Sequence, residues 1–271
     1  MSEDRDYLHG YTKVEQQRLI DQAEILAPQL YEGLDFSAHK KMLEVGCGVG
    51  AQTGLLLERF PGLYIHGVDV SQAQIGLAKE RLSGLVDEGR AKFTCADATD
   101  LTSMEDGGFD SAYICWFLEH VYEPIAVLKS LKEKLQPGSK VYLTEVNNSS
   151  LFVQPYSPNI LKYWSELNDY QWTINGHPFI GLMLANLLLK AGFKNVQTEP
   201  RSFFFDDRDP VDRQKFMNYF FGIFNSANDT LVRKGRIHHE MIKDVRAEFE
   251  AAMGAEGSVF YYSYVRATAE A

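Results

Sequence analysis

The sequence predicts an α/β fold with a doubly wound, mostly parallel sheet and helices on both of its faces. Two observations predict this class. Between residues 14 and 146, short apolar segments typical of buried strands alternate with helical segments. The first of these strands also runs into a glycine-rich turn and an amphipathic helix. Because ligands of such sheets bind at the carboxyl ends of the strands, the residues at those ends are the first candidates for a site.

The first element after the helix expected at residues 14–30 is a strand at residues 42–45, followed by the glycine-rich turn. Gly46 and Gly48 let the backbone turn tightly and let a ligand approach the main chain. The helix beyond the turn directs its N-terminal N–H groups toward that ligand. Together with Ala51, the two glycines also satisfy the dinucleotide pattern, so an NAD-dependent oxidoreductase remains an open alternative.

Acidic residues stand at the ends of the next strands. Glu44 comes two residues before Gly46, where a dinucleotide pattern usually has an apolar residue, and it can pair with a cationic ammonium. Asp69 ends the second strand and can accept both hydroxyls of a ribose. Asp97 ends the third strand and can recognise an adenine amino group. We expect these parallel strands at residues 42–45, 64–71, 91–99, 109–117 and 140–146.

These motifs resemble those of the class I S-adenosylmethionine-dependent methyltransferases. The first motif of that family reads acid-x-Gly-x-Gly-x-Gly, as Glu44, Gly46, Gly48 and Gly50 do. Further segments follow in the family's order up to residue 146, namely GVDVS, CADA, FLEHVYEP and LKEKLQPGSKVYLTEV. The resemblance implies a sheet of seven strands with the last one antiparallel, and it implies S-adenosyl-L-methionine as the cofactor.

The resemblance also implies a cofactor site. Glu44 and the backbone of residues 46–48 would hold the methionine part, Asp69 the ribose, and Asp97 with Ala98 the adenine. The full predicted set is Tyr11, Glu44, Gly46, Cys47, Gly48, Gln52, Asp69, Val70, Gln74, Asp97, Ala98, Cys115, Trp116 and Phe117. For the two glutamines, and for the cysteine and phenylalanine that end the fourth strand, solvation or core packing is an equally open interpretation.

The pattern changes beyond residue 146. Residues 147–179 are rich in aromatic and turn residues, and we expect a loop region there. A helix at residues 181–192 and a sixth strand at residues 194–205 follow, then inserted helices at about residues 209–253 and a last strand at residues 257–269. This count fits one methyltransferase domain over residues 1–271 with a helical cap formed by the N-terminal region and the late insertion. Its cofactor-binding half would be residues 40–146, and its substrate-side half residues 147–271.

The acceptor site is expected to be built from the variable segments. Their many aromatic residues suit an aromatic or otherwise bulky small molecule, although most of those between residues 216 and 224 are also explained as the core of the cap. The predicted substrate residues are Tyr7, Asn147, Trp172 and His177. Two residues are candidates for removing a proton from the methyl acceptor: His120, which follows the fourth strand, and Glu145, near the mouth of the expected site. A structural role is the alternative interpretation for His120.

Composition excludes several other classes of protein. The formal charge of −10 opposes binding of a nucleic acid, and no apolar run approaches the length of a membrane span. The polar N-terminus has no secretory signal, so we expect a cytoplasmic protein. We expect no metal requirement, because the acids after the fourth strand form no recognisable ligand set. A non-catalytic, cofactor-binding regulatory protein remains an alternative, and nothing in the sequence indicates the oligomeric state.

Overall fold

The computed structural model describes the backbone of residues 13–271 and the side chains of residues 16–271. Its strands form one sheet in the order β3-β2-β1-β4-β5-β7-β6. They are β1 Lys41–Val45, β2 Tyr64–Asp69, β3 Ala91–Cys95, β4 Phe109–Cys115, β5 Leu135–Gln154, β6 Lys194–Phe205 and β7 Val259–Glu270. Neighbours from β3 to β5 pair in parallel, whereas β7 is antiparallel to both β5 and β6. The predicted fold class, including the antiparallel last strand, is confirmed.

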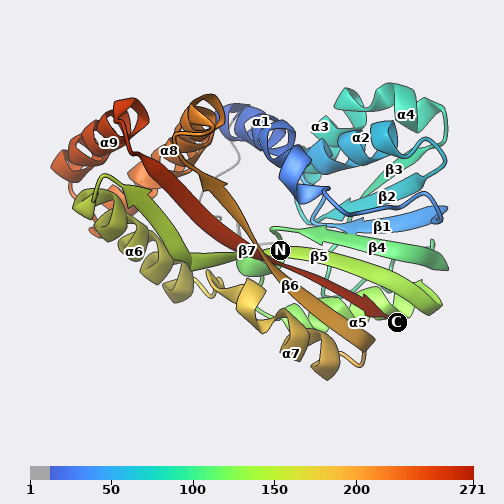
Figure 1. The fold of residues 1–271 in the computed structure, drawn as a ribbon. Coiled ribbons are helices and arrows are strands. Elements are labelled where there is room, and N and C mark those ends of the chain that lie inside the picture. Colours follow the sequence, from blue (N-terminus) through green and yellow to red (C-terminus); the bar gives the residue numbers. More distant parts are fainter. Residues whose placement is uncertain (1–12) are drawn as a thin grey trace.

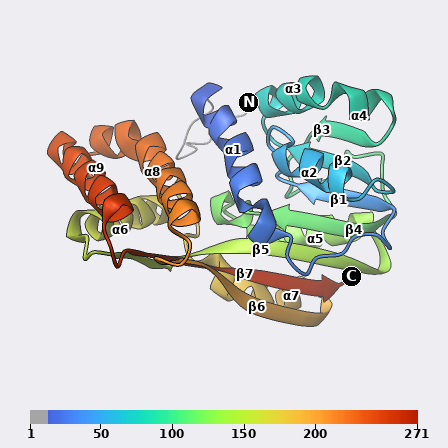
Figure 2. The ribbon, with the colours of Figure 1, turned by 45° about the horizontal axis from the view of Figure 1, so that its top comes forward.

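Helices cover both faces of this sheet. The α-helices are α1 Lys13–Leu30, α2 Ala51–Arg59, α3 Gln72–Arg81, α4 Ser83–Asp87, α5 Pro124–Lys134, α6 Pro158–Thr173, α7 Leu184–Lys190, α8 Pro210–Arg233 and α9 His239–Gly254, with 3-10 turns η1 Leu118–His120 and η2 Ile180–Met183. Helices α1 to α4 lie on one face, and α5 and α7 lie on the other (Figures 1 and 2). The chain passes from β3 to β4 through residues 96–108 without a helix.

Strands β5, β6 and β7 continue beyond the parallel strands and carry α6, α8 and α9 at their far end (Figure 1). The prediction of a loop at residues 147–179 is therefore wrong. The first part of this segment extends β5 to Gln154, with a register shift between Asn147 and Phe152, and the second part forms α6. Phe152 pairs with Tyr261 of β7, so a distant strand decides the conformation here. The strand propensity of the local sequence does not predict pairing with such a distant strand.

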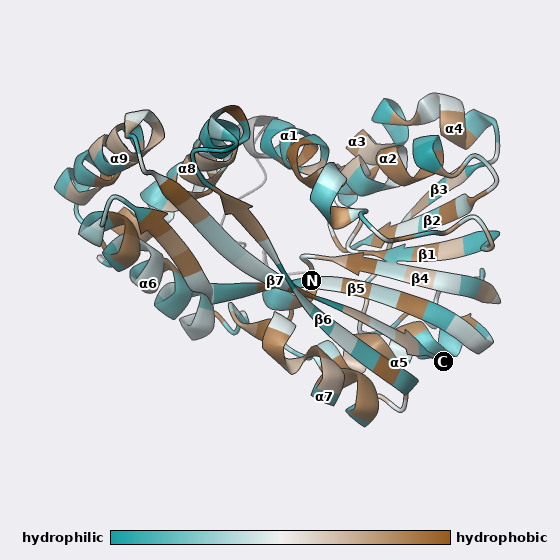
Figure 3. Cartoon of the chain, viewed as in Figure 1, coloured by the Kyte–Doolittle hydropathy of each residue, from teal (hydrophilic) through white to brown (hydrophobic). Residues whose placement is uncertain are grey.

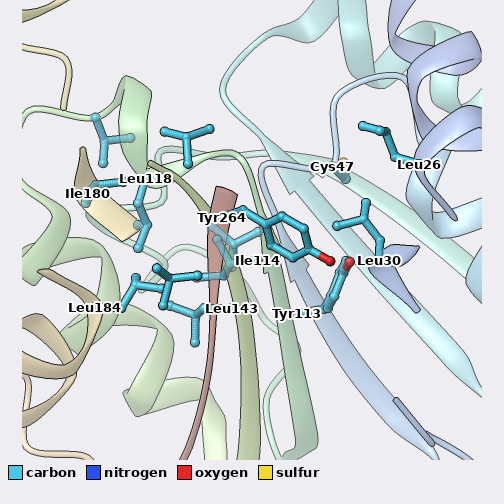
Figure 4. Packing of buried hydrophobic residues seen from close by; sticks show 14 of the residues in the cluster. Leu26, Leu30, Cys47, Tyr113, Ile114, Leu118, Leu143, Ile180, Leu184 and Tyr264 are labelled. Atoms are coloured by element: carbon cyan, nitrogen blue, oxygen red, sulfur yellow. The ribbon is translucent and has the colours of Figure 1, made fainter. Parts of the chain in front are cut away.

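The core occupies both faces of the central strands, and brown, hydrophobic stretches of β1 and β4 alternate there with paler and teal ones (Figure 3). Figure 4 shows the packing around Ile114 of β4, with Leu26 and Leu30 of α1 and with Ile180 and Leu184 of η2 and α7. These side chains are at most 1% exposed. Truncating one such leucine to alanine typically costs about 2–5 kcal/mol of stability. The well-packed core gives the strand ends a rigid base for a site.

Candidate active site

A cavity of about 220 Å³ lies at the carboxyl ends of β1, β2 and β4. It is bounded by the glycine turn before α2, by the start of α3, and by residues of α1 and α6. Of the residues predicted to bind the cofactor, twelve line it: Gly46, Cys47, Gly48, Gln52, Asp69, Val70, Gln74, Asp97, Ala98, Cys115, Trp116 and Phe117. His120 lines it as well. Residues far apart in the sequence are thus brought to one edge of the sheet.

The glycine turn is held in place by the neighbouring strand. The N–H groups of Gly46 and Cys47 donate to the Val68 carbonyl oxygen at 2.9 and 3.0 Å. Gly46 has φ 76°, and a Cβ there would lie 2.3 Å from the ring of Phe117, so a larger residue would both strain the backbone and displace that ring. At Gly48 a Cβ would meet no atom within 4 Å, which leaves that part of the turn open.

Two carboxylates on the cavity wall are fixed by hydrogen bonds. Asp69 accepts the Gly48 N–H at 3.0 Å and the Ser71 N–H at 2.9 Å, which ties β2 to the glycine turn and to the start of α3. Burial nevertheless raises the pKa of this carboxyl above its usual value. Asp97 accepts the N–H and the hydroxyl of Thr99 at 2.9 and 2.8 Å. Both groups therefore present an oriented acceptor to the cavity.

Glu44 lies behind the glycine turn and does not line the cavity. It is 3% exposed, and its Oε2 accepts the hydroxyl hydrogen of Thr53 at 2.5 Å. Burial raises the pKa of this carboxyl to about 7, and the nearby charge of Asp69 acts in the same direction. A cation at the glycine turn would favour the charged form of this carboxyl.

A second cavity of about 90 Å³ adjoins the first. Five residues line both: Leu19, Gln22, Trp116, His120 and Gln171. The aromatic wall of the second cavity comes from four elements, α6, β6, α8 and β7, and consists of Trp164, Phe203, Tyr219, Phe220 and Tyr262. No sequence pattern marks Gln22 or Gln171 as site residues, because only the docking of α1 and α6 brings them to the junction.

His120 stands at this junction beside a buried carboxylate. Its Nε2 lies 3.6 Å from Oε1 of Glu119, which is 8% exposed. The other oxygen of Glu119 accepts a hydrogen bond from Gln171 Nε2 at 2.9 Å. The arrangement suits His120 as a proton acceptor and Glu119 as its orienting partner.

Glu145 is fully buried under the turn that follows β4 and lines neither cavity. Its Oε1 accepts the N–H groups of Phe117 and Leu118 at 3.0 and 2.7 Å. Burial raises its pKa to about 8, and the charge of Glu119 adds to this. The turn also holds Trp116 at φ 48°, a conformation that non-glycine residues rarely adopt. The structure therefore places Glu145 as an anchor of the turn.

Three of the predicted substrate residues, Asn147, Trp172 and His177, line neither cavity. Asn147 donates its Nδ2 hydrogen to Ser263 Oγ at 2.9 Å. Trp172 is 59% exposed and lies edge-on to the ring of His177, at 5.8 Å between ring centroids. Tyr7 and Tyr11 lie outside the described residues. Between residues 16 and 271 no cluster of three His, Cys, Asp or Glu side chains is arranged to hold a metal ion.

Comparison with known proteins identifies the family. Residues 43–143, which supply most of the cavity wall, match the model of a family described as "Methyltransferase domain". Over these residues the chain is similar to a methyltransferase domain, which supports a class I S-adenosylmethionine-dependent methyltransferase. This confirms the predicted family, and it supports S-adenosylmethionine as the cofactor.

Two curated relatives and a solved structure illustrate how far the likeness of this methyltransferase domain extends. The chain is 33% identical to methyltransferase GfsG of Streptomyces halstedii over 47% of this chain and 45% of the relative. It is 30% identical to O-methyltransferase cnsE of Penicillium expansum over 57% of this chain and 52% of that relative. The structure of Haemonchus contortus phosphoethanolamine N-methyltransferase 2, in complex with phosphomonomethylethanolamine and S-adenosylhomocysteine, matches with TM-score 0.60 and 16% identity over 100% of this chain and 60% of that one. The chain spans about half the length of the curated relatives it matches.

None of the helices from α1 to α9 is long and apolar enough to cross a membrane.

Proposed function

We propose that the protein is an S-adenosylmethionine-dependent methyltransferase that methylates a small-molecule acceptor. One observation carries the proposal: the cavity beside the glycine turn shares Trp116 and His120 with an adjoining second cavity that has an aromatic wall. A cofactor in the first cavity and an acceptor in the second would meet at this junction. Several of the curated relatives are named O-methyltransferases, which agrees with a small acceptor.

The residues present fit the cofactor. Gly48 leaves the turn open toward the cavity, and the Gln74 side chain is buried on its wall with an Oε1 that has no partner among the described residues. Asp69 would accept the ribose hydroxyls, and Asp97 with Ala98 would bind the adenine edge. Glu44 would act from behind the turn, by becoming negatively charged when the cationic methionine part is bound.

The protein's part in the chemistry is mainly alignment. S-adenosylmethionine supplies an electrophilic methyl group for an in-line displacement. The walls of the two cavities hold the reacting atoms in line and exclude water, which accounts for a large share of the rate enhancement in such reactions. Where the acceptor must lose a proton, the His120 imidazole would take it at the junction.

The experiment that tests the function is a calorimetric titration of the purified protein with S-adenosylmethionine and, separately, with NAD. Binding of S-adenosylmethionine alone supports the proposal, and binding of NAD alone would replace it by the oxidoreductase alternative. Formation of S-adenosylhomocysteine with an acceptor would exclude a non-catalytic regulatory protein.

We also propose that residues 1–271 work as one domain. Residues 40–146 would bind the cofactor and residues 147–271 would select the acceptor, since most of the aromatic wall comes from the second half. The expected cytoplasmic location and the expected lack of nucleic-acid binding remain predictions, and so does the lack of a metal requirement.

A further inference from the structure

Gln52 is held from outside its own helix. It is the second residue of α2, so its side chain starts directly beside the glycine turn, and it is half-buried on the wall of the first cavity. Its Oε1 accepts a hydrogen bond from the hydroxyl of Tyr31, which follows the last residue of α1. A contact between two helices, rather than the local sequence of α2, therefore decides how this side chain lies.

The contact with Tyr31 gives the Gln52 amide a direction. A glutamine amide has an oxygen that only accepts hydrogen bonds and a nitrogen that only donates them. Because Oε1 is turned to Tyr31, which does not line the cavity, the group that Gln52 can present to the cavity is Nε2. Among residues 16–271 no group is hydrogen-bonded to this nitrogen. Gln52 therefore faces the cavity as a donor.

Tyr31 is itself fixed in position. Its side chain is 2% exposed, and its backbone N–H donates to the Ala27 carbonyl oxygen at 3.0 Å, which continues the hydrogen bonding of α1. The guanidinium of Arg59, on α2, lies 5.9 Å from the centroid of its ring. Burial raises the pKa of the Tyr31 hydroxyl above its usual value, so the hydroxyl stays protonated. Oε1 of Gln52 thus has a permanent donor as its partner.

A second amide on the wall of the first cavity is held in the same way. Oε1 of Gln22 accepts a hydrogen bond from Arg18 Nη1 at 2.7 Å, so Gln22 also has its nitrogen left for a ligand. The ends of β2 and β3 differ, because Asp69 and Asp97 bring acceptor oxygens to the same cavity. The side of the cavity formed by α1 and α2 is therefore rich in donors, which suits a carboxylate.

We propose that Tyr31 is a positioning residue, which turns the Gln52 amide so that Nε2 donates to the carboxylate of the bound cofactor. This inference rests on the proposed function and concerns the same site. The methionine part of S-adenosylmethionine carries a carboxylate, which accepts hydrogen bonds, and an ammonium, which donates them. An amide free to turn over would bind either group, whereas an amide with its oxygen fixed selects the carboxylate. Tyr31 thereby acts on the ligand without touching it.

The first test compares two ligands that differ by the carboxylate alone, S-adenosylhomocysteine and its decarboxylated analogue, by calorimetric titration of the full chain. In Tyr31→Phe, S-adenosylhomocysteine should bind about fivefold more weakly, the effect of one hydrogen bond, whereas the analogue should bind as it does to the wild type. A merely structural role of Tyr31 would weaken both ligands equally. Tyr264→Phe is the matched control and should change neither affinity. The Tyr264 hydroxyl also bonds to α1, at the Gln29 carbonyl oxygen, but Tyr264 lines neither cavity.

The second test asks whether Tyr31 acts through Gln52. Gln52→Ala should weaken binding of S-adenosylhomocysteine about tenfold, the loss of a hydrogen bond to a charged group, and should leave binding of the analogue unchanged. Adding Tyr31→Phe to Gln52→Ala should then cause no further loss, because the amide that Tyr31 turns is absent. Gln52→Glu leaves Tyr31 in place and should weaken S-adenosylhomocysteine more than the analogue, because two carboxylates then meet.

The outcomes separate the two proposals. If neither S-adenosylmethionine nor S-adenosylhomocysteine binds the wild type, the proposed function fails and this inference fails with it. If they bind, and Tyr31→Phe weakens both test ligands equally or neither of them, the positioning role is overturned while the proposed function stands. A further loss in the double variant overturns the action through Gln52. An equal change for both ligands in Gln52→Glu overturns the carboxylate contact.

Discussion

The two halves of the molecule build their parts of the site in different ways. In the parallel half, short strands such as the five residues of β1 end in turns whose polar groups bond to near neighbours, as Gly48 does to Asp69 over 21 positions. In the other half, β5 runs for 20 residues, and Tyr262 bonds to Asn148 across 114 positions. Local motifs thus hold the first cavity, and long-range packing holds the second.

This difference agrees with the separate roles proposed for the two halves. A turn fixed by hydrogen bonds to the adjacent strand can keep one geometry while more distant parts of the chain vary, which suits a common cofactor. A wall assembled from four distant elements changes shape when any of them changes, which suits a specific acceptor. Variants in each half should therefore separate cofactor binding from acceptor selection.

The largest effect is expected in the acceptor half. Phe224 is 1% exposed and stacks on Tyr163 and Trp164 at 4.7 and 5.4 Å. Phe224→Ala should lower the free energy of unfolding by about 3–5 kcal/mol, because it leaves a cavity in the cap. Chemical denaturation measures this, with Val211→Ala, at a 73% exposed position of the same helix, as the control. A loss below 1 kcal/mol would show that the cap is not packed as described.

The next effect belongs to the cofactor half. Asp69→Ala should weaken S-adenosylmethionine binding by about 1.5–3 kcal/mol, the range for a lost hydrogen bond to a charged group. Calorimetry measures the affinity, and Asp87→Ala, an exposed aspartate on α4, should leave it unchanged. Unchanged affinity in Asp69→Ala would remove this carboxylate from the site.

The stability of the protein should depend on pH through Glu145, which anchors the turn after β4. Its pKa is raised to about 8, so the protonated form is favoured in the folded protein. The stability from this group is fully present below its unfolded pKa near 4.5 and is lost as pH rises through about 8. Relative to Glu145→Gln, the wild type should lose on the order of 2 kcal/mol between pH 5 and 8. Denaturation curves at several pH values measure this, and parallel pH profiles of the two proteins would contradict it.

The smallest effect is expected at Trp172. This side chain is 59% exposed and lines neither cavity, so Trp172→Ala should change stability and acceptor affinity by no more than about 0.5 kcal/mol. Denaturation measures the stability, and titration with an acceptor that gives turnover to S-adenosylhomocysteine measures the affinity. A large loss of acceptor affinity would restore Trp172 to the acceptor site, where its sequence position had suggested it.

Much of the cofactor cavity could be predicted because its residues follow strands whose apolar pattern is plain. Asp69 and Asp97 each stand just where a strand ends, so the topology alone brings them together. Glu44 shows the limit of this reasoning, since its place near the end of β1 follows from the sequence, whereas its side chain turns to Thr53 behind the glycine turn. The direction of a buried carboxylate depends on which partner is within reach, and a position in the sequence does not specify that partner.

By itself, the sequence determined the alternating architecture, the glycine turn and the acids at the strand ends, because periodicity and turn chemistry act over a few residues. Only the tertiary structure decided that β5 continues past residue 147, that Gln22 and Gln171 reach the junction, and that Trp172 stays outside. The physical reason is that these outcomes depend on strand pairing and helix docking between segments far apart in the chain. The free energy of such pairing and docking comes from long-range contacts, which a local sequence pattern does not predict.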